Sequence, residues 1–186
     1  MNMRKISINE FKKRRFERSY ISVYIVIRPI SVENEQEIEV KNLCVIYGLT
    51  ALGVRRIIAI YFENTNDNRF WLGVFKDLKA RNLQNIMFLV TPQNKNIERC
   101  AKIIYNNIEI IRSTEDIMSA IDRYFATKTS RTLEIQLKNL ILAEDIEKCE
   151  ENIELFKQQY LHNRLVLEVF KRQEDDIKKC INIITI

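Results

Sequence analysis

A cluster of basic residues near the amino terminus is the clearest chemical feature of this sequence. Residues 1–18 hold seven Lys and Arg against two acidic residues, five of the seven within "FKKRRFER" (11–18). The rest of the chain holds equal numbers of both, so the net charge of +5 comes from this arm. Such a cluster attracts phosphate groups. We therefore predict nucleic-acid contacts here, with a solvated leader or a remnant of a longer chain as the alternative. The candidate residues are Lys12, Lys13, Arg14, Arg15 and Arg18.

This chain lacks the residues that most forms of covalent catalysis need. His162 is the single histidine, so neither a nucleophilic triad nor a zinc site is expected. Three glycines are too few for a glycine-rich phosphate loop. The four cysteines form no CxxC pair, which predicts reduced thiols in a cytoplasmic protein. No apolar run is long enough to span a membrane, and no signal-peptide segment is recognised.

The elements that must position any functional residue change type along the chain. Segments rich in β-branched and aromatic residues predict an antiparallel meander of three strands, at 20–30, 37–49 and 54–62. Pro29 is expected to close the first strand. The helix that follows has one apolar face, formed by Trp71, Val74, Phe75 and Leu78. Next come a buried strand, a helix and a short strand, at 85–91, 94–106 and 108–112.

The second half of the chain is predicted to be helical. Helices are expected near 114–126, 132–147 and 151–171. The last residues, "CINIITI", fit a strand, a helix end or a truncation scar. The predicted organisation is a basic arm, an α/β core, and a helical insertion with a truncated C-terminal segment, at residues 1–19, 20–113 and 114–186.

Three stretches of sequence resemble a known family. They are "YISVYI" (20–25), "CVIYGLT" (44–50) and "FWLGVFKDLKARNLQNI" (70–86). The last follows the pattern F-W-x-x-V-x-x-x-L-K-x-R-G-x-x-x-I, with Asn82 in place of the glycine. The chain from about Tyr20 onwards resembles the catalytic-domain region of mutator-type bacterial insertion-sequence transposases. The order of predicted elements is also that of a ribonuclease H-like fold, a mixed sheet of three antiparallel and then two parallel strands, here with a helical insertion.

The resemblance implies a two-magnesium site for which this chain lacks ligands. The family's first two metal-binding aspartates fall on Ser22 and on Thr91, which Pro92 follows, and a family Cys and His fall near Ser113 and Asp116. The text that approaches the third acid, "DDIKKCINIITI", matches to the last residue of the sequence. Hard Mg²⁺ needs carboxylate oxygens, and a hydroxyl carries no charge. No cofactor is therefore predicted, and Mg²⁺ is expected only if the protein is active.

These features predict a catalytically inactive, transposase-derived protein that retains DNA binding or associates with a transposase as a homo- or hetero-oligomer, without membrane contact. One alternative is an active transposase or nuclease whose metal site has moved to other acids. Those acids are Glu109, Glu115, Asp116, Asp175 and Asp176. Glu115 and Asp116 equally suit the first turn of a helix. The other alternative is a protein-interaction module without nucleic-acid contact.

Two further groups on the predicted helix near residues 70–81 have two interpretations each. Phe70 and Trp71 could stack on bases, although their helical spacing favours packing in the core. Lys76, Lys79 and Arg81 lie on the opposite face, where they either contact DNA or keep that face soluble.

Overall fold

The computed structural model describes residue 11 and residues 13–33, 38–63, 67–124, 127–141 and 143–184. The chain divides into two compact units, Met1–Ile110 and Ile111–Ile186. None of the helices in these described ranges is long and apolar enough to cross a bilayer.

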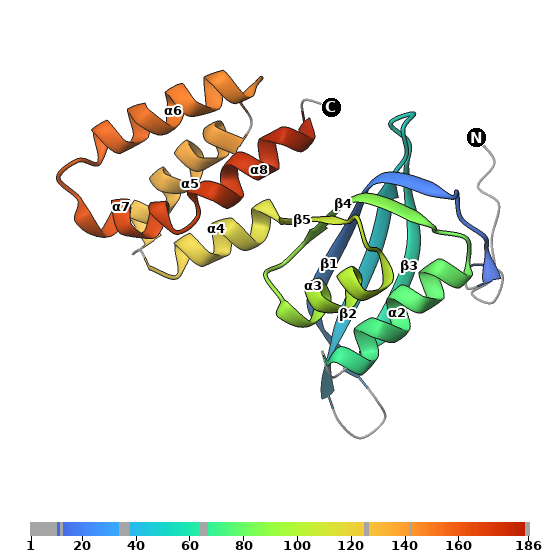
Figure 1. Ribbon diagram of the computed structural model, residues 1–186. Coiled ribbons are helices and arrows are strands. Elements are labelled where there is room, and N and C mark those ends of the chain that lie inside the picture. The colour runs from blue at the N-terminus through green and yellow to red at the C-terminus, as the bar shows by residue number, and fades with distance from the viewer. Residues whose placement is uncertain are drawn as a thin grey trace, which may run out of the picture. The chain divides into compact units, whose positions relative to one another are not determined.

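A five-stranded mixed sheet organises the α/β part of the chain (Figure 1). Its strands are β1 (Ser19–Glu33), β2 (Ile38–Leu49), β3 (Arg55–Glu63), β4 (Asn85–Thr91) and β5 (Glu109–Arg112). They lie in the order β3-β2-β1-β4-β5. β2 pairs antiparallel with both β1 and β3, whereas β1 pairs parallel with β4. This is the ribonuclease H-like arrangement, so the predicted fold class is confirmed.

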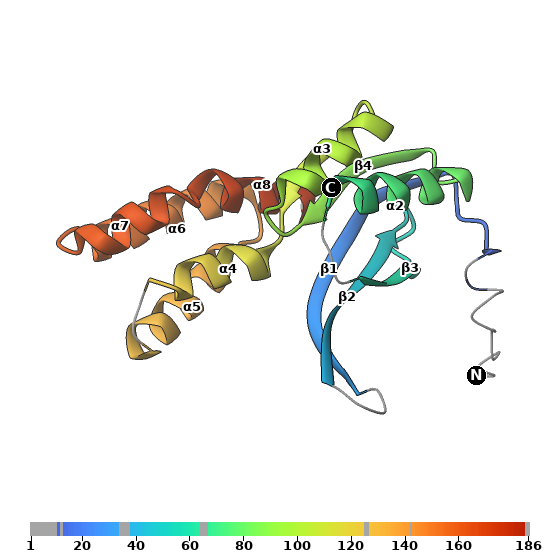
Figure 2. The same cartoon turned by 90° about the horizontal axis from the view of Figure 1, so that it is seen from below.

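Helices α2 (Asn68–Ala80) and α3 (Lys95–Ile104) lie together on one face of this sheet (Figure 2). The predicted apolar face of α2 is confirmed, because Trp71, Val74, Phe75 and Leu78 are all buried. Each helix begins where a side chain accepts a hydrogen bond from a free backbone N–H, Asp67 for α2 and Asn94 for α3. The rings of Phe70, Trp71, Phe75 and Tyr105 then continue as one chain of aromatic contacts through the core.

The first strand is longer than the sequence predicts. Pro29 was expected to close it, but β1 continues to Glu33 and Pro29 is the register partner of Asn42 in β2. The reason lies in the pairing on the other side of β1, where β4 reaches only from Ser19 to Tyr24. Beyond Tyr24, no strand within the described ranges pairs with that side of β1, so a proline without an N–H is tolerated there.

After the end of β5, the described residues of the second unit form helices, which are shorter than predicted. They are α4 (Thr114–Asp122), α5 (Thr127–Ile141), α6 (Ile146–Gln159), α7 (Arg164–Lys171) and α8 (Glu174–Ile184). The single helix expected over 151–171 is wrong, because the Asn163 side chain caps a new helix and separates α6 from α7. Asp145 starts α6 in the same way. Of the three interpretations of "CINIITI", the structure supports the helix end, since Cys180–Ile184 belong to α8.

This helical unit has a core of its own. Phe156 packs against Tyr160 and Phe170, with ring centroids 4.8 and 4.5 Å apart. Aliphatic side chains from the other helices complete the buried set; they include Ile117, Ile121, Leu133, Leu137, Ile153, Val169, Ile177 and Ile181.

Candidate functional site

Ser22 and Thr91, the two positions where the family resemblance predicts metal-binding carboxylates, lie on neighbouring parallel strands. Ser22 is near the start of β1, between Leu49 of β2 and Phe88 of β4. Thr91 is the last residue of β4, three positions beyond Phe88. Their exposed fractions are 0% and 1%. Among the described residues, neither Ser22 Oγ nor Thr91 Oγ1 has a hydrogen-bond partner.

These two hydroxyls do not fit a divalent cation. A site for Mg²⁺ is built from several carboxylate oxygens, whose charge offsets the cost of removing water from the ion. Ser22 and Thr91 supply no charge, and Phe88 and Leu49 beside Ser22 are apolar. Across the described ranges, no group of three or more His, Cys, Asp or Glu side chains is arranged to hold a metal ion.

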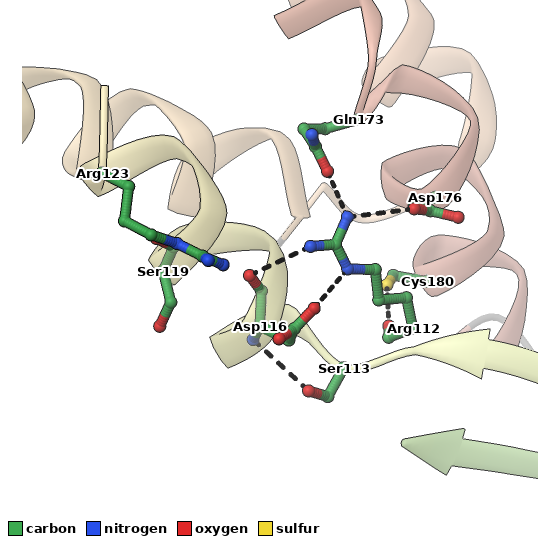
Figure 3. A network of polar contacts seen from close by, with 8 residues as sticks. All are labelled: Arg112, Ser113, Asp116, Ser119, Arg123, Gln173, Asp176 and Cys180. Carbon is green, nitrogen blue, oxygen red and sulfur yellow. Dashed lines mark hydrogen bonds and ion pairs between the residues drawn. The ribbon is translucent and has the colours of Figure 1, made fainter. Parts of the chain in front are cut away.

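Two of the five acids considered for a relocated metal site, Asp116 and Asp176, contact the Arg112 guanidinium (Figure 3). Arg112, at the end of β5, donates from Nε to Asp116 Oδ2 at 2.5 Å and from Nη1 to Asp176 Oδ2 at 3.4 Å. The same guanidinium donates to Gln173 Oε1, and its side chain is 8% exposed. A fixed cation thus lies between the two carboxylates. The remaining three acids, Glu109, Glu115 and Asp175, are exposed.

Ser113 and Asp116 stabilise the start of α4 beside this cluster. Ser113 Oγ accepts a hydrogen bond from the Asp116 backbone N–H at 3.3 Å, which caps α4. Cys180 of α8 donates its S–H to the backbone oxygen of Arg112. The Arg112 cluster therefore ties the end of β5 to the start of α4 and to α8. No local pattern predicts the contacts to α8 and Gln173, because these partners lie 61 to 68 positions beyond Arg112.

The predicted DNA-binding residues differ in what they contact. Lys12 lies outside the described residues. Lys13, Arg15 and Arg18 are exposed. Arg14 is half-buried and donates from Nη2 to the backbone oxygen of Ile57 in β3 at 2.7 Å.

Two of the three basic residues considered on the polar face of α2 contact the protein itself. The interpretation of Arg81 as a residue that contacts DNA or solvent is wrong. Its side chain is only 12% exposed, and its guanidinium binds the backbone oxygens of residues 11, 14 and 58. Lys79 donates to the Ile104 oxygen at 2.8 Å and lies over the Tyr105 ring. Lys76 is exposed.

The four cysteines are buried and carry no disulfide. Burial raises the pKa of the Cys44 and Cys180 thiols to about 12 and also raises the pKa of Cys100 and Cys149. Because the thiolate is the nucleophile, these side chains are unreactive at neutral pH.

Comparison with known proteins is consistent with this architecture. The family model described as "Transposase, Mutator family" matches residues 3–182. The transposase for insertion sequence element ISRM3 of Rhizobium meliloti (strain 1021) is 24% identical over 161 residues. The probable transposase for an ISRM3-like element of Sinorhizobium fredii (strain NBRC 101917 / NGR234) is 22% identical over 161 residues. Both alignments cover 83% of this chain and 38% of the relative, so the chain spans well under half the length of either relative.

A solved structure shows a loose similarity. The chain of the Drosophila P element transposase strand transfer complex is 8% identical, with a TM-score of 0.36. That match covers 96% of this chain and 50% of the other.

Proposed function

The chain belongs to the Mutator family of transposases, and we propose that it keeps the scaffold of that family and binds DNA without metal-dependent strand transfer. In this role it acts alone as a DNA-binding protein or joins an intact transposase in a homo- or hetero-oligomer. The proposal applies to the part of its longer relatives that this chain spans.

The burial of two unpartnered hydroxyls at the positions of the family's aspartates carries the proposal. A pair of magnesium ions works by holding the attacking and leaving oxygens of a phosphodiester, and the protein's share is to fix the ions with carboxylates. Ser22 and Thr91 supply no carboxylate, and both side chains are buried. Loss of two anionic ligands removes the electrostatic basis of catalysis rather than weakening it.

The arrangement around Arg112 counts against a relocated active site. Asp116 and Asp176 are the two acids of the alternative set that contact a common partner, the positively charged Arg112 guanidinium, which lowers their combined negative charge. A metal ion entering this cluster would have to displace a buried cation that also bonds to Gln173.

Two measurements on the full chain test the proposal. A supercoiled plasmid is incubated with the protein in Mg²⁺ or Mn²⁺, and nicking is followed on gels; we expect the same rate with and without metal. Fluorescence anisotropy with a labelled duplex at low salt is expected to show binding that weakens steeply as salt rises.

The alternatives make opposite predictions in these assays. Metal-dependent nicking that disappears in Asp116→Asn or Asp176→Asn, but persists in the exposed control Asp175→Asn, would establish a relocated site. Absence of duplex binding at low salt would favour a protein-interaction module instead.

A further inference from the structure

The segment Phe11–Arg18 is docked onto the α/β unit. Phe16 is buried, and its N–H donates to the Arg81 oxygen at 2.9 Å while Asn82 Nδ2 donates to the Phe16 oxygen at 3.0 Å. The Arg18 oxygen accepts from the N–H groups of Gln84 and Asn85 at 2.9 and 3.0 Å. The turn after α2 thus fixes the described part of this segment through its backbone.

Arg81 is the centre of this docking. Its Nε donates to the Arg14 oxygen at 3.1 Å, and its Nη2 donates to the Phe11 oxygen at 2.9 Å. Nη1 bonds to Asp77 at 3.2 Å, which keeps the guanidinium oriented. The guanidinium plane also lies over the Phe16 ring, 4.1 Å from its centroid. A planar fork with five donors can serve several carbonyls at once, whereas a lysine ammonium cannot reproduce this geometry.

The turn at Asn82 explains how Arg81 reaches these partners. Asn82 has a φ of 86°, a left-handed conformation in which glycine is favoured and asparagine is tolerated.

The docked segment runs beside the edge strand β3. The strand carries an irregularity opposite Ile46 and Tyr47, where Ile57 pairs with Tyr47 but Ala59 pairs with Ile46, so Ile58 is an extra residue. Arg14 and Arg81 bind the backbone oxygens of Ile57 and Ile58 at this bulge. Glu17 then pairs with Arg56 at 3.2 Å, which joins the two segments at the surface.

Docking of this segment beside β3 creates a basic ridge. We define the ridge as the exposed, positively charged side chains within residues 13–18 and 55–56. They are Lys13, Arg15, Arg18, Arg55 and Arg56. Glu17 is the single acid in these two stretches of sequence. Four of the five ridge residues are arginines, whose planar forks match phosphate oxygens.

We propose that the basic ridge binds the sugar-phosphate backbone of DNA without reading sequence, and that Arg81 is a positioning residue that holds the ridge in place. This inference rests on the proposed DNA binding and assigns it to a surface. Docking of the backbone before DNA arrives reduces the entropy lost on binding, compared with a free tail of the same charge. Each phosphate contact releases condensed counterions, so the number of contacts appears in the salt dependence.

The salt dependence of binding tests the ridge. Affinity of the full chain for a random-sequence duplex is measured by anisotropy over a salt series, for wild type and for the triple variant Arg15→Gln, Arg18→Gln, Arg55→Gln. If each residue contacts one phosphate, the slope of log K against log salt becomes shallower by about 0.9 per residue, or about 2.7 in all.

A matched control separates the ridge from net charge. It removes the same charge from exposed arginines elsewhere, at Arg99, Arg123 and Arg164. We expect the control to keep the wild-type slope. If the two triple variants show equal slopes of log K against log salt, the ridge is not the DNA-binding surface. If wild type binds no duplex at low salt, the proposed DNA binding itself is wrong. Wild-type binding with an unchanged slope in the ridge variant would reject the ridge alone.

The variant Arg81→Lys tests whether Arg81 positions the ridge, because lysine keeps the positive charge but lacks the planar guanidinium that binds several carbonyls at once. We expect weaker DNA binding in the wild-type background and no further loss in the ridge triple variant, since Arg81 acts through the ridge. A purely structural effect would lower affinity equally in both backgrounds, and that result would reject the positioning role. Fluorescence of the single tryptophan, Trp71, checks that each variant is folded.

Discussion

Removing the two buried hydroxyls should stabilise this protein. Ser22 Oγ and Thr91 Oγ1 are shielded from water and have no hydrogen-bond partner in the described part of the chain, and a hydroxyl in that state costs about 1–3 kcal/mol. Ser22→Ala removes only the oxygen, and Thr91→Val replaces it with a methyl group of similar size. We expect each change to raise the free energy of unfolding by about 1 kcal/mol, the lower end of this range, because unfolded chains also lose some water contact.

The two changes should also be additive. Thr91 lies three residues beyond Phe88, the register partner of Ser22, which is about 10 Å along the strand. Sites at that distance without a shared partner usually contribute independently. The double variant should therefore gain about 2 kcal/mol, the sum of the two single changes.

Urea unfolding followed by the fluorescence of Trp71 measures this effect. Trp71 is 1% exposed and belongs to the same unit as both hydroxyls, so its signal reports the unfolding of that unit. Ser22→Asp is the opposing control, because it buries a carboxylate without a partner and should destabilise by several kcal/mol. Added Mg²⁺ should not restore its stability.

A different outcome would refute the reasoning directly. If Ser22→Ala or Thr91→Val lowers the free energy of unfolding by more than about 0.5 kcal/mol, beyond the usual effect of a neutral substitution, the hydroxyl has a partner in solution. If Mg²⁺ stabilises Ser22→Asp in a concentration-dependent way, other ligands for a metal ion are present nearby.

Three other predictions concern separate parts of the molecule. Gly48→Ala should destabilise the α/β unit by about 1–3 kcal/mol in the same urea assay, because the new Cβ would lie 2.4 Å from Cδ1 of the Tyr20 ring; an unchanged urea midpoint would contradict this. Burial acts to raise the pKa of Glu174, but hydrogen bonds and charges from Lys157 and Lys178 outweigh it and lower that pKa. The stabilisation is therefore present above the unfolded-state pKa and is lost as pH falls through the lower folded-state value, so Glu174→Gln should reduce helical stability at pH 7 and have little effect in acid, as measured by circular dichroism. Cys180, whose pKa burial raises to about 12, should resist iodoacetamide at pH 8 until urea is added; rapid labelling of the native protein would show that it is accessible.

Local periodicity predicted the parts of the fold that depend on local order. The face of α2 was correct because Trp71, Val74, Phe75 and Leu78 repeat with the helix itself. The extent of β1 was not, because tolerance of Pro29 depends on how far β4 reaches along the neighbouring edge. Asn163 was overlooked as a helix start because the polar residues around it resemble those of an exposed helix face.

In the candidate site, too, the sequence predicts positions but not the contacts between distant residues. The positions of Ser22 and Thr91 could be found from the family pattern, but their isolation from any partner is a property of the packed sheet. Arg81 was interpreted as a surface residue, since an arginine at the polar end of a helix normally faces solvent. Its partners Phe11 and Arg14 are about 70 positions away in the chain, and no sequence window connects them.

The parallel pairing of β1 with β4 also determines when this protein can fold during synthesis. The meander of β1, β2 and β3 can form from neighbouring residues, but Ser22 has no partner on its other side until Phe88 has left the ribosome. Strand pairing across such a sequence separation is slow, whereas helices that contact near neighbours fold quickly. The nascent chain therefore carries an open strand edge until β4 has been synthesised, and this interval is when a chaperone would protect it from aggregation.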